Sequence, residues 1–191
     1  MQSAFHNYEI PKGEKIMDRN NPNTFNASGF VDYVIRRVKN KSDTAFRAAM
    51  RRGSNPAMES TVWEYLISYC DISVERIRRA FALVGAAIAS EAPDTDGSAS
   101  VGRALRSICK NDDDVDRESR RLRRLLSCDT TDELIGVLRP MMHYIQENAA
   151  SALSYSRLLN DLCYWNERTR IRWTQDFFYK QSDKEEETTQ P

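Results

Sequence analysis

Residues 29–39 read Gly-Phe-Val-Asp-Tyr-Val-Ile-Arg-Arg-Val-Lys, and this stretch decides the class of fold. Its apolar residues are Phe30, Val31, Val34, Ile35 and Val38. Their spacings of i, i+1, i+4, i+5 and i+8 place them on one side of a helix, and the basic residues lie off that stripe. The pattern predicts an amphipathic helix that packs against a core.

Helical signals continue along the rest of the chain. Ser42 is the expected N-cap of a second helix, Pro56 opens a third, and Ser73 caps a fourth that runs to about residue 90. Pro140 is expected to bend or break the helix in which it lies. Further helices are expected near residues 101–110, 115–127, 131–147, 151–163 and 166–180.

Composition favours an all-α fold. Glycine (7) and proline (6) are sparse and β-branched runs are nearly absent, which argues against a sandwich or a barrel. The segment Ser-Glu-Ala-Pro-Asp-Thr-Asp-Gly-Ser-Ala-Ser at residues 90–100 is the clearest break in composition. We therefore expect two small helical bundles in one chain, joined by an acidic linker. The predicted parts are an irregular N-terminal arm (1–26), a bundle (27–90), the linker (91–100), a second bundle (101–180) and a disordered acidic tail (181–191).

The formal net charge is zero, but its distribution is uneven. Residues 27–90 carry ten Lys and Arg against six Asp and Glu, and residues 101–180 carry 14 against 12. The linker and the tail each have a net charge of −3. The predicted folded parts are thus basic, and the compensating acid lies in segments expected to be mobile.

The residues that enzymes need are scarce. The two histidines, His6 and His143, have no partner at metal-ligand or triad spacing, and no phosphate-binding glycine motif occurs. The four cysteines stand singly, so we expect reduced thiols of a cytoplasmic protein rather than disulfides. The longest apolar run, residues 80–89, is too short to span a bilayer and predicts a buried helix. No enzymatic activity, cofactor, metal or membrane contact is expected.

One acidic segment suggests an enzyme. Residues 112–116 read Asp-Asp-Asp-Val-Asp and contain the D-D-x-x-D pattern with which helical isoprenoid enzymes bind Mg²⁺. Those enzymes also need a second acidic motif facing the first and a large apolar cavity, and the sequence shows neither. The favoured interpretation places these carboxylates at a helix N-terminus, where the helix dipole stabilises them.

An arginine cluster follows directly. At 100° per residue, Leu122 and Leu126 fall close to Val115 and predict a core face. The opposite side carries arginines spaced i, i+3, i+4 and i+7: Arg117, Arg120, Arg121 and Arg124, with Arg123 nearer the flank. Such a cluster binds either the neighbouring carboxylates or a phosphate backbone, and the sequence leaves both open.

The C-terminal helix carries a second basic group. Arg168, Arg170 and Arg172 lie among Tyr164, Trp165 and Trp173. Basic residues interleaved with aromatics are typical of stacking on splayed bases, whereas aromatics more often form a core. Ile171, Phe177 and Phe178 favour the second interpretation, a packed terminal helix.

Several segments resemble the CasB family. They are Val-Gly-Arg-Ala-Leu at 101–105, residues 120–126, Asp-Thr-Thr at 129–131, Leu-Arg at 138–139, Leu-Cys-Tyr-Trp-Asn-Glu-Arg-Thr-Arg at 162–170, and Gln-Asp-Phe at 175–177. That family is the small subunit of the type I-E CRISPR surveillance complex, Cascade. The resemblance covers residues 101–178 well and residues 28–90 only in helix pattern.

The resemblance implies two helical bundles, head-to-tail self-association within Cascade, and contacts to guide RNA and target DNA in the R-loop without an active site. Arg103, Arg139, Arg168 and Arg170 match family positions with nucleic-acid or assembly roles, and Arg76 aligns more loosely. The chain departs from its relatives at residues 127–130, a turn that tends to carry arginines in the family and has none here. Either Arg123 and Arg124 serve instead, or that contact is absent.

The sequence therefore predicts a non-catalytic Cascade subunit that stabilises an R-loop through the nucleic-acid backbone, while base pairing reads the sequence. The alternative is a helical protein–protein adaptor that binds no nucleic acid. The candidate binding residues are Arg76, Arg103, Arg117, Arg120, Arg121, Arg124, Arg139, Arg168, Arg170 and Arg172.

Overall fold

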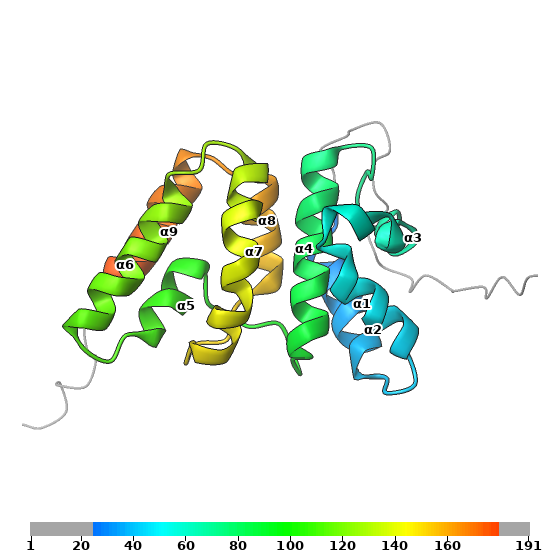
Figure 1. Ribbon diagram of the computed structural model, residues 1–191, viewed down its shortest axis with the longest axis horizontal. Helices are drawn as coiled ribbons and strands as arrows, with labels where there is room; N and C mark the ends of the chain where they lie inside the picture. The colour runs from blue at the N-terminus through cyan, green and yellow to red at the C-terminus, as the bar shows by residue number, and fades with distance from the viewer. Residues whose placement is uncertain (1–24, 180–191) are drawn as a thin grey trace, which may run out of the picture.

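The computed structural model of the protein describes residues 25–179, and this part of the chain is all-α, as predicted (Figure 1). Predictions for the N-terminal arm before residue 25 and for the acidic tail lie outside the described residues. The elements are α1 (Ala27–Lys39), α2 (Thr44–Gly53), a 3-10 helix η1 (Pro56–Val62), α3 (Trp63–Leu66), α4 (Glu75–Glu91), α5 (Val101–Ile108), α6 (Asp112–Leu126), α7 (Thr131–Asn148), α8 (Tyr155–Cys163) and α9 (Glu167–Phe178).

Residues 29–39, the stretch that decides the class of fold, lie in α1 as predicted. Asn26 caps the helix, because its side-chain oxygen accepts the Gly29 N–H at 2.8 Å. All five apolar residues of the predicted stripe are buried. The 3.6-residue period therefore identified both the helix and the face that it packs.

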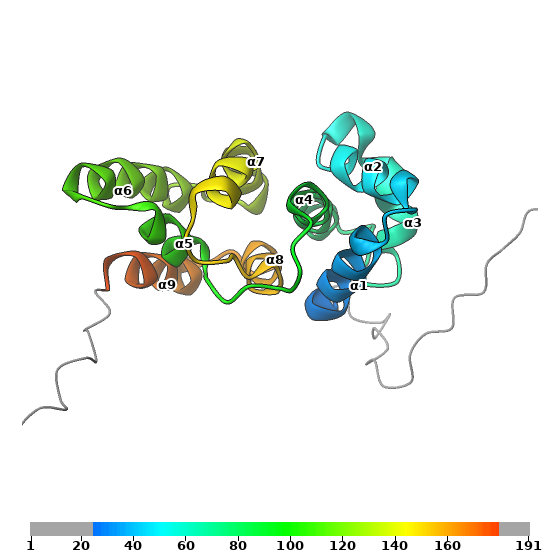
Figure 2. The same cartoon turned by 90° about the horizontal axis from the view of Figure 1, so that it is seen from below.

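Helix α4 lies at the centre of the molecule. The apolar run at residues 80–89 is buried on all its sides, because α1 and α2 pack against one flank of α4 and α7 and α8 against the other (Figure 2). The buried apolar side chains of the two halves form one continuous cluster. The division into two bundles stays a prediction, since α4 packs on both halves. None of the helices within residues 25–179 is both long and apolar enough to cross a bilayer.

The acidic linker is anchored rather than loose. The two carboxylate oxygens of Asp96 accept the backbone N–H groups of Tyr155 at 2.5 Å and Ser156 at 3.2 Å, at the start of α8. The carboxylate of Glu91 accepts the hydroxyl of Tyr155. The structure thus differs from the expectation of a mobile linker, because two of its three carboxylates, Glu91 and Asp96, bind α8, while Asp94 faces solvent.

Two local predictions were also wrong. Ser42 and Ser73 are not N-caps: Asp43 and Val74 occupy those positions, and each serine hydroxyl donates instead to the side chain two residues earlier. Pro140 was expected to bend or break its helix, and it does not break α7, which continues to Asn148. Its ring lies on the exposed side of the helix, and the buried residues on both sides of it hold the two turns in the core.

The cysteines are free thiols in the described structure, as predicted. Burial raises the pKa of Cys163 to about 12 and also raises the pKa of Cys70, Cys109 and Cys128. Because only the thiolate is reactive, less than about one Cys163 in 10,000 is reactive at pH 7.5.

We therefore expect Ellman's reagent to label the native protein slowly at pH 7.5 and to label four thiols at once in guanidinium chloride. Native labelling that is as fast as labelling of the unfolded chain would contradict the burial of these residues. Fewer than four thiols in denaturant without reductant would indicate a disulfide.

Candidate nucleic-acid interface

The acidic segment at residues 112–116 forms the start of α6. Asn111 caps the helix by accepting the Asp114 N–H at 2.9 Å, and three aspartates occupy the first turn. The Asp114 carboxylate accepts the Lys110 N–H at 2.9 Å, and this bond lowers the pKa of its carboxyl. The favoured helix-terminus interpretation accounts for these contacts. Among residues 25–179 no three His, Cys, Asp or Glu side chains are grouped to hold a metal ion.

The buried face of α6 is rotated from the predicted one. Leu122 and Leu125 are fully buried, whereas Val115 and Leu126 are only partly buried. The rotation brings Glu118 inside, with no exposed surface. A carboxylate is tolerated there only when it is paired.

Glu118 is paired by its neighbours on α6 and α7. Arg121 forms an ion pair with the carboxylate, and the Tyr144 hydroxyl donates to it at 2.7 Å. The Arg121 guanidinium also lies over the Tyr144 ring, 4.2 Å from its centroid. Arg117 forms an ion pair with Asp114 at 2.6 Å and a longer one with Glu118 at 3.4 Å. Two of the four clustered arginines, Arg117 and Arg121, therefore form ion pairs with carboxylates of the same helix.

Arg120 and Arg124 have a different environment. Both are exposed, as is Arg123, and no ion pair within residues 25–179 includes any of them. They stand on the side of α6 that faces away from Leu122 and Leu125. These three arginines are the part of the predicted cluster that remains available to a partner.

Arg170 holds the turn between α6 and α7. Its Nη2 donates to the Cys128 carbonyl at 2.6 Å and lies 3.3 Å from an Asp129 carboxylate oxygen. Trp165 donates its indole N–H to the same carbonyl at 2.8 Å. These bonds bring the end of α6 and the start of α9 to one edge of the molecule, at the top of Figure 1. The turn that lacks arginines thus lies beside arginines of α6 and α9.

Arg76 links the two halves at the same edge. Its Nη1 donates to the Cys163 carbonyl at the end of α8, at 2.8 Å. Arg79, one turn later, forms an ion pair with Asp132 of α7 at 3.0 Å. The structure gives Arg76 a packing contact that sequence spacing did not reveal.

Arg168 and Arg172 line an open groove between α8 and α9. Its lining residues are Ser156, Arg157, Asn160, Asp161, Tyr164, Asn166, Arg168, Thr169 and Arg172. Arg172 pairs with Asp161, whose other carboxylate oxygen accepts the Trp173 indole N–H at 2.6 Å. Burial raises the pKa of the Asp161 carboxyl, although these two partners favour its charged form. Arg168 is exposed and takes no part in the ion pairs found among residues 25–179.

The remaining predicted residues lie on α5 and α7. Arg103 is exposed beside Gly102, where a Cβ would stand 2.1 Å from the Trp173 carbonyl oxygen of α9. The Gly-Arg-Ala-Leu segment is thus a packing motif that places an arginine on the surface. Arg139 is half-buried on α7, and its Nε has no hydrogen-bond partner in the described structure.

The aromatic residues divide between core and surface. Trp173 and Phe177 are fully buried, as expected for a packed terminal helix. Ile171 and Phe178 are about half exposed, because they lie on the side of α9 that faces away from α5. The prediction that these two residues are packed was wrong. Tyr164 is also about half exposed and borders the groove.

Two features were missed at the level of sequence. Arg157 of α8 and Arg168 of α9 line the same groove although eleven residues separate them. Glu118 was not singled out among the carboxylates near the arginine cluster, but it is the buried residue that forms an ion pair with Arg121. A glutamate on the apolar side of α6, four residues before Leu122, was the signal that could have indicated its burial.

Known proteins share this fold. The family model of the CRISPR-associated protein Cse2 matches residues 46–178. The crystal structure of CasB from Thermus thermophilus is 24% identical with a TM-score of 0.60, over 81% of this chain and 99% of that one. CasB of M. ruber is 23% identical with a TM-score of 0.57, over 79% and 93% of the two chains. A chain from a CRISPR RNA-guided surveillance complex is 22% identical with a TM-score of 0.59, over 79% and 89%. None of the curated proteins compared with the chain matches it.

Proposed function

The chain belongs to the CRISPR-associated Cse2 family, and on this premise we propose that it is the non-catalytic small subunit of a type I-E Cascade complex. In this role it contacts the backbones of guide RNA and target DNA and stabilises the R-loop. The similarity to a chain of a CRISPR RNA-guided surveillance complex supports the assignment to such an assembly. Base pairing supplies sequence recognition in these complexes, so that backbone contacts are sufficient for the protein.

One observation carries the nucleic-acid part of the proposal. Eight arginines are exposed and form no ion pair within the described residues. Three of them, Arg36, Arg51 and Arg52, lie on α1 and α2. The other five lie in the C-terminal half, and we call these five the exposed arginines: Arg103, Arg120, Arg123, Arg124 and Arg168. Arg117, Arg121 and Arg172 have carboxylate partners, and Arg76 and Arg170 donate to backbone carbonyls. We assign phosphate contact first to the exposed arginines, and positioning of helices to the paired ones.

The partner assignments have separate support. Exposed apolar residues lie at the two ends of the long axis: Trp63 and Ile67 on and beside α3, and Ile171 and Phe178 on α9 (Figure 1). Such residues at opposite ends suit a head-to-tail contact between copies of the chain, or contacts to other Cascade subunits. The adaptor alternative uses the same apolar residues and leaves the exposed arginines without a role.

Salt dependence separates the two functions. Each phosphate that is neutralised contributes roughly 0.7–0.9 to the slope of log K against log[salt]. We expect a slope between about −3 and −4.5 if four or five exposed arginines each meet a phosphate. The measurement is fluorescence anisotropy of labelled DNA with the full chain, or with the assembled complex, between 50 and 300 mM salt. A slope near zero, or strong preference for one base sequence, would overturn the nucleic-acid proposal and favour the adaptor.

A further inference from the structure

The groove between α8 and α9 is a built feature of the fold. It has a volume of about 490 Å³, within the range of roughly 300–1,000 Å³ that is typical of ligand sites. Its charged lining consists of three arginines and one aspartate, so that its net charge is positive. Asn160 and Asn166 add amide groups at its border. The groove is therefore suited to an anionic ligand with polar edges.

Tyr164 forms an aromatic platform at one end of the groove. Its backbone is fixed by hydrogen bonds: its N–H donates to the Asn160 carbonyl at 2.9 Å, and its own carbonyl accepts the Asn166 amide at 2.7 Å. Its ring packs on Phe25 with a centroid distance of 5.2 Å, and Phe25 packs edge-on against the buried Phe81. The core thus supports the ring from one side, while the residue remains 51% exposed.

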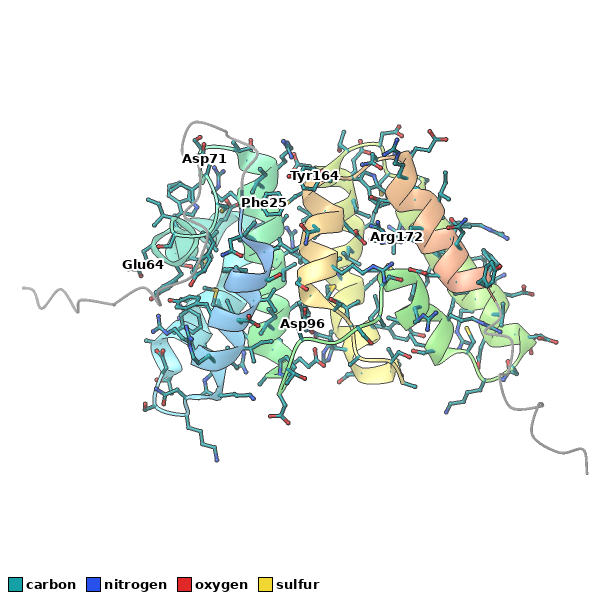
Figure 3. All side chains as sticks on the ribbon, turned by 180° about the vertical axis from the view of Figure 1, so that it is seen from behind. Phe25, Glu64, Asp71, Asp96, Tyr164 and Arg172 are labelled. Carbon is teal, nitrogen blue, oxygen red and sulfur yellow. The ribbon has the colours of Figure 1, made fainter. Side chains whose placement is uncertain are left out.

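The three arginines of the groove differ in whether they already form an ion pair with a carboxylate. Arg172 is paired with Asp161, and Arg157 is paired with Asp176 at 3.0 Å. Arg168 follows Tyr164 by four residues, lines the same groove and is exposed. Figure 3 shows Tyr164 at the end of α8 and Arg172 between α8 and α9. An exposed cation beside an exposed ring can bind a phosphate and a base of one nucleotide together.

We propose that this groove binds one unstacked nucleotide of a single strand, with its base on Tyr164 and its phosphate against Arg168. The inference rests on the proposed function and adds a base contact to it. A base inside a duplex is stacked on both faces and is not available to the ring. The chain therefore binds single-stranded nucleic acid in preference to duplex at this position, without reading its sequence, because every base has a face that can stack.

The test compares a labelled single-stranded thymidine oligonucleotide with the same oligonucleotide carrying abasic sites at its central positions. The two probes have the same phosphates and differ only in bases. With the full chain at 50 mM salt we expect the abasic probe to bind roughly 5- to 150-fold more weakly, the range for loss of one base–aromatic stack. Tyr164→Ala should bind both probes alike, at the level of the abasic probe, and Tyr164→Phe should keep the difference.

Tyr179→Ala is the matched control, because Tyr179 is an exposed tyrosine that follows α9 and lies outside the groove. It should behave as the unmodified chain does. Equal affinity of the unmodified chain for the two probes, with the steep salt slope retained, would overturn the nucleotide site and leave the proposed function standing. Equal losses in Tyr164→Ala and Tyr179→Ala would also overturn it. Absence of salt-dependent binding to either probe would overturn both proposals.

Discussion

Replacing Gly102 with alanine is expected to destabilise the protein by about 3 kcal/mol or more, which corresponds to a fall in melting temperature of roughly 6–12 °C. A Cβ at this position would stand 2.1 Å from the Trp173 carbonyl oxygen and 2.9 Å from its carbonyl carbon. Those atoms belong to the backbone of α9 and have little room to retreat. Trp173 is fully buried, and its indole donates to Asp161. The methyl group can be accommodated only if α5 and α9 separate.

Gly136 provides the control for this prediction. It lies within α7, is exposed, and a Cβ there would meet no atom within 4 Å. Gly136→Ala should therefore stabilise the protein by about 0.5–1 kcal/mol, because alanine loses less backbone entropy than glycine in a helix. Thermal and urea denaturation, followed by circular dichroism, measures both variants. If Gly102→Ala is as stable as Gly136→Ala, the close approach of α5 to α9 is not present in solution.

This contrast shows where sequence reasoning was sufficient. Periodicity identified the stripe of α1 and the all-apolar α4, because a helix that must bury one face, or all of them, shows this in its composition. The Gly-Arg-Ala-Leu segment was singled out only through a family resemblance. The physical reason for its glycine is the α9 backbone, about seventy residues further along the chain.

The candidate nucleic-acid interface shows what the sequence could not predict. Helical geometry indicated that arginines cluster on α6, but it did not predict which of them have partners. Arg121 lies on the flank of the helix, where it forms an ion pair with the buried Glu118 and packs over the ring of Tyr144 of α7. Arg170 is directed to a carbonyl of a distant turn. A basic pattern in a sequence gives the number of charges, whereas the availability of each charge to a partner depends on tertiary contacts.

The availability of Arg120 and Arg124 leads to the second large effect. Reversing both to glutamate is expected to weaken retention of target DNA by the assembled complex by roughly 50-fold or more at 0.1 M salt. Each lost phosphate contact accounts for a factor of about eight at this salt concentration, and the slope of log K against log[salt] should become shallower by about 2. The fold should tolerate the change, because both side chains are exposed and unpaired within the described residues. The melting temperature should stay nearly constant, since exposed charges of this kind contribute within about 0.5 kcal/mol each.

Arg36→Glu with Lys39→Glu changes the charge by the same amount on the exposed side of α1 and serves as the control. This pair lies on the opposite half of the molecule from α6 (Figure 2). A specific arginine surface on α6 requires that the control retains DNA far better than the α6 variant, and that the difference shrinks as salt rises. Equal losses in the two variants would mean that net charge alone governs binding. Failure of the α6 variant to enter the complex would instead make this side of α6 an assembly surface, because Arg120 and Arg124 would then be facing another subunit rather than a phosphate backbone.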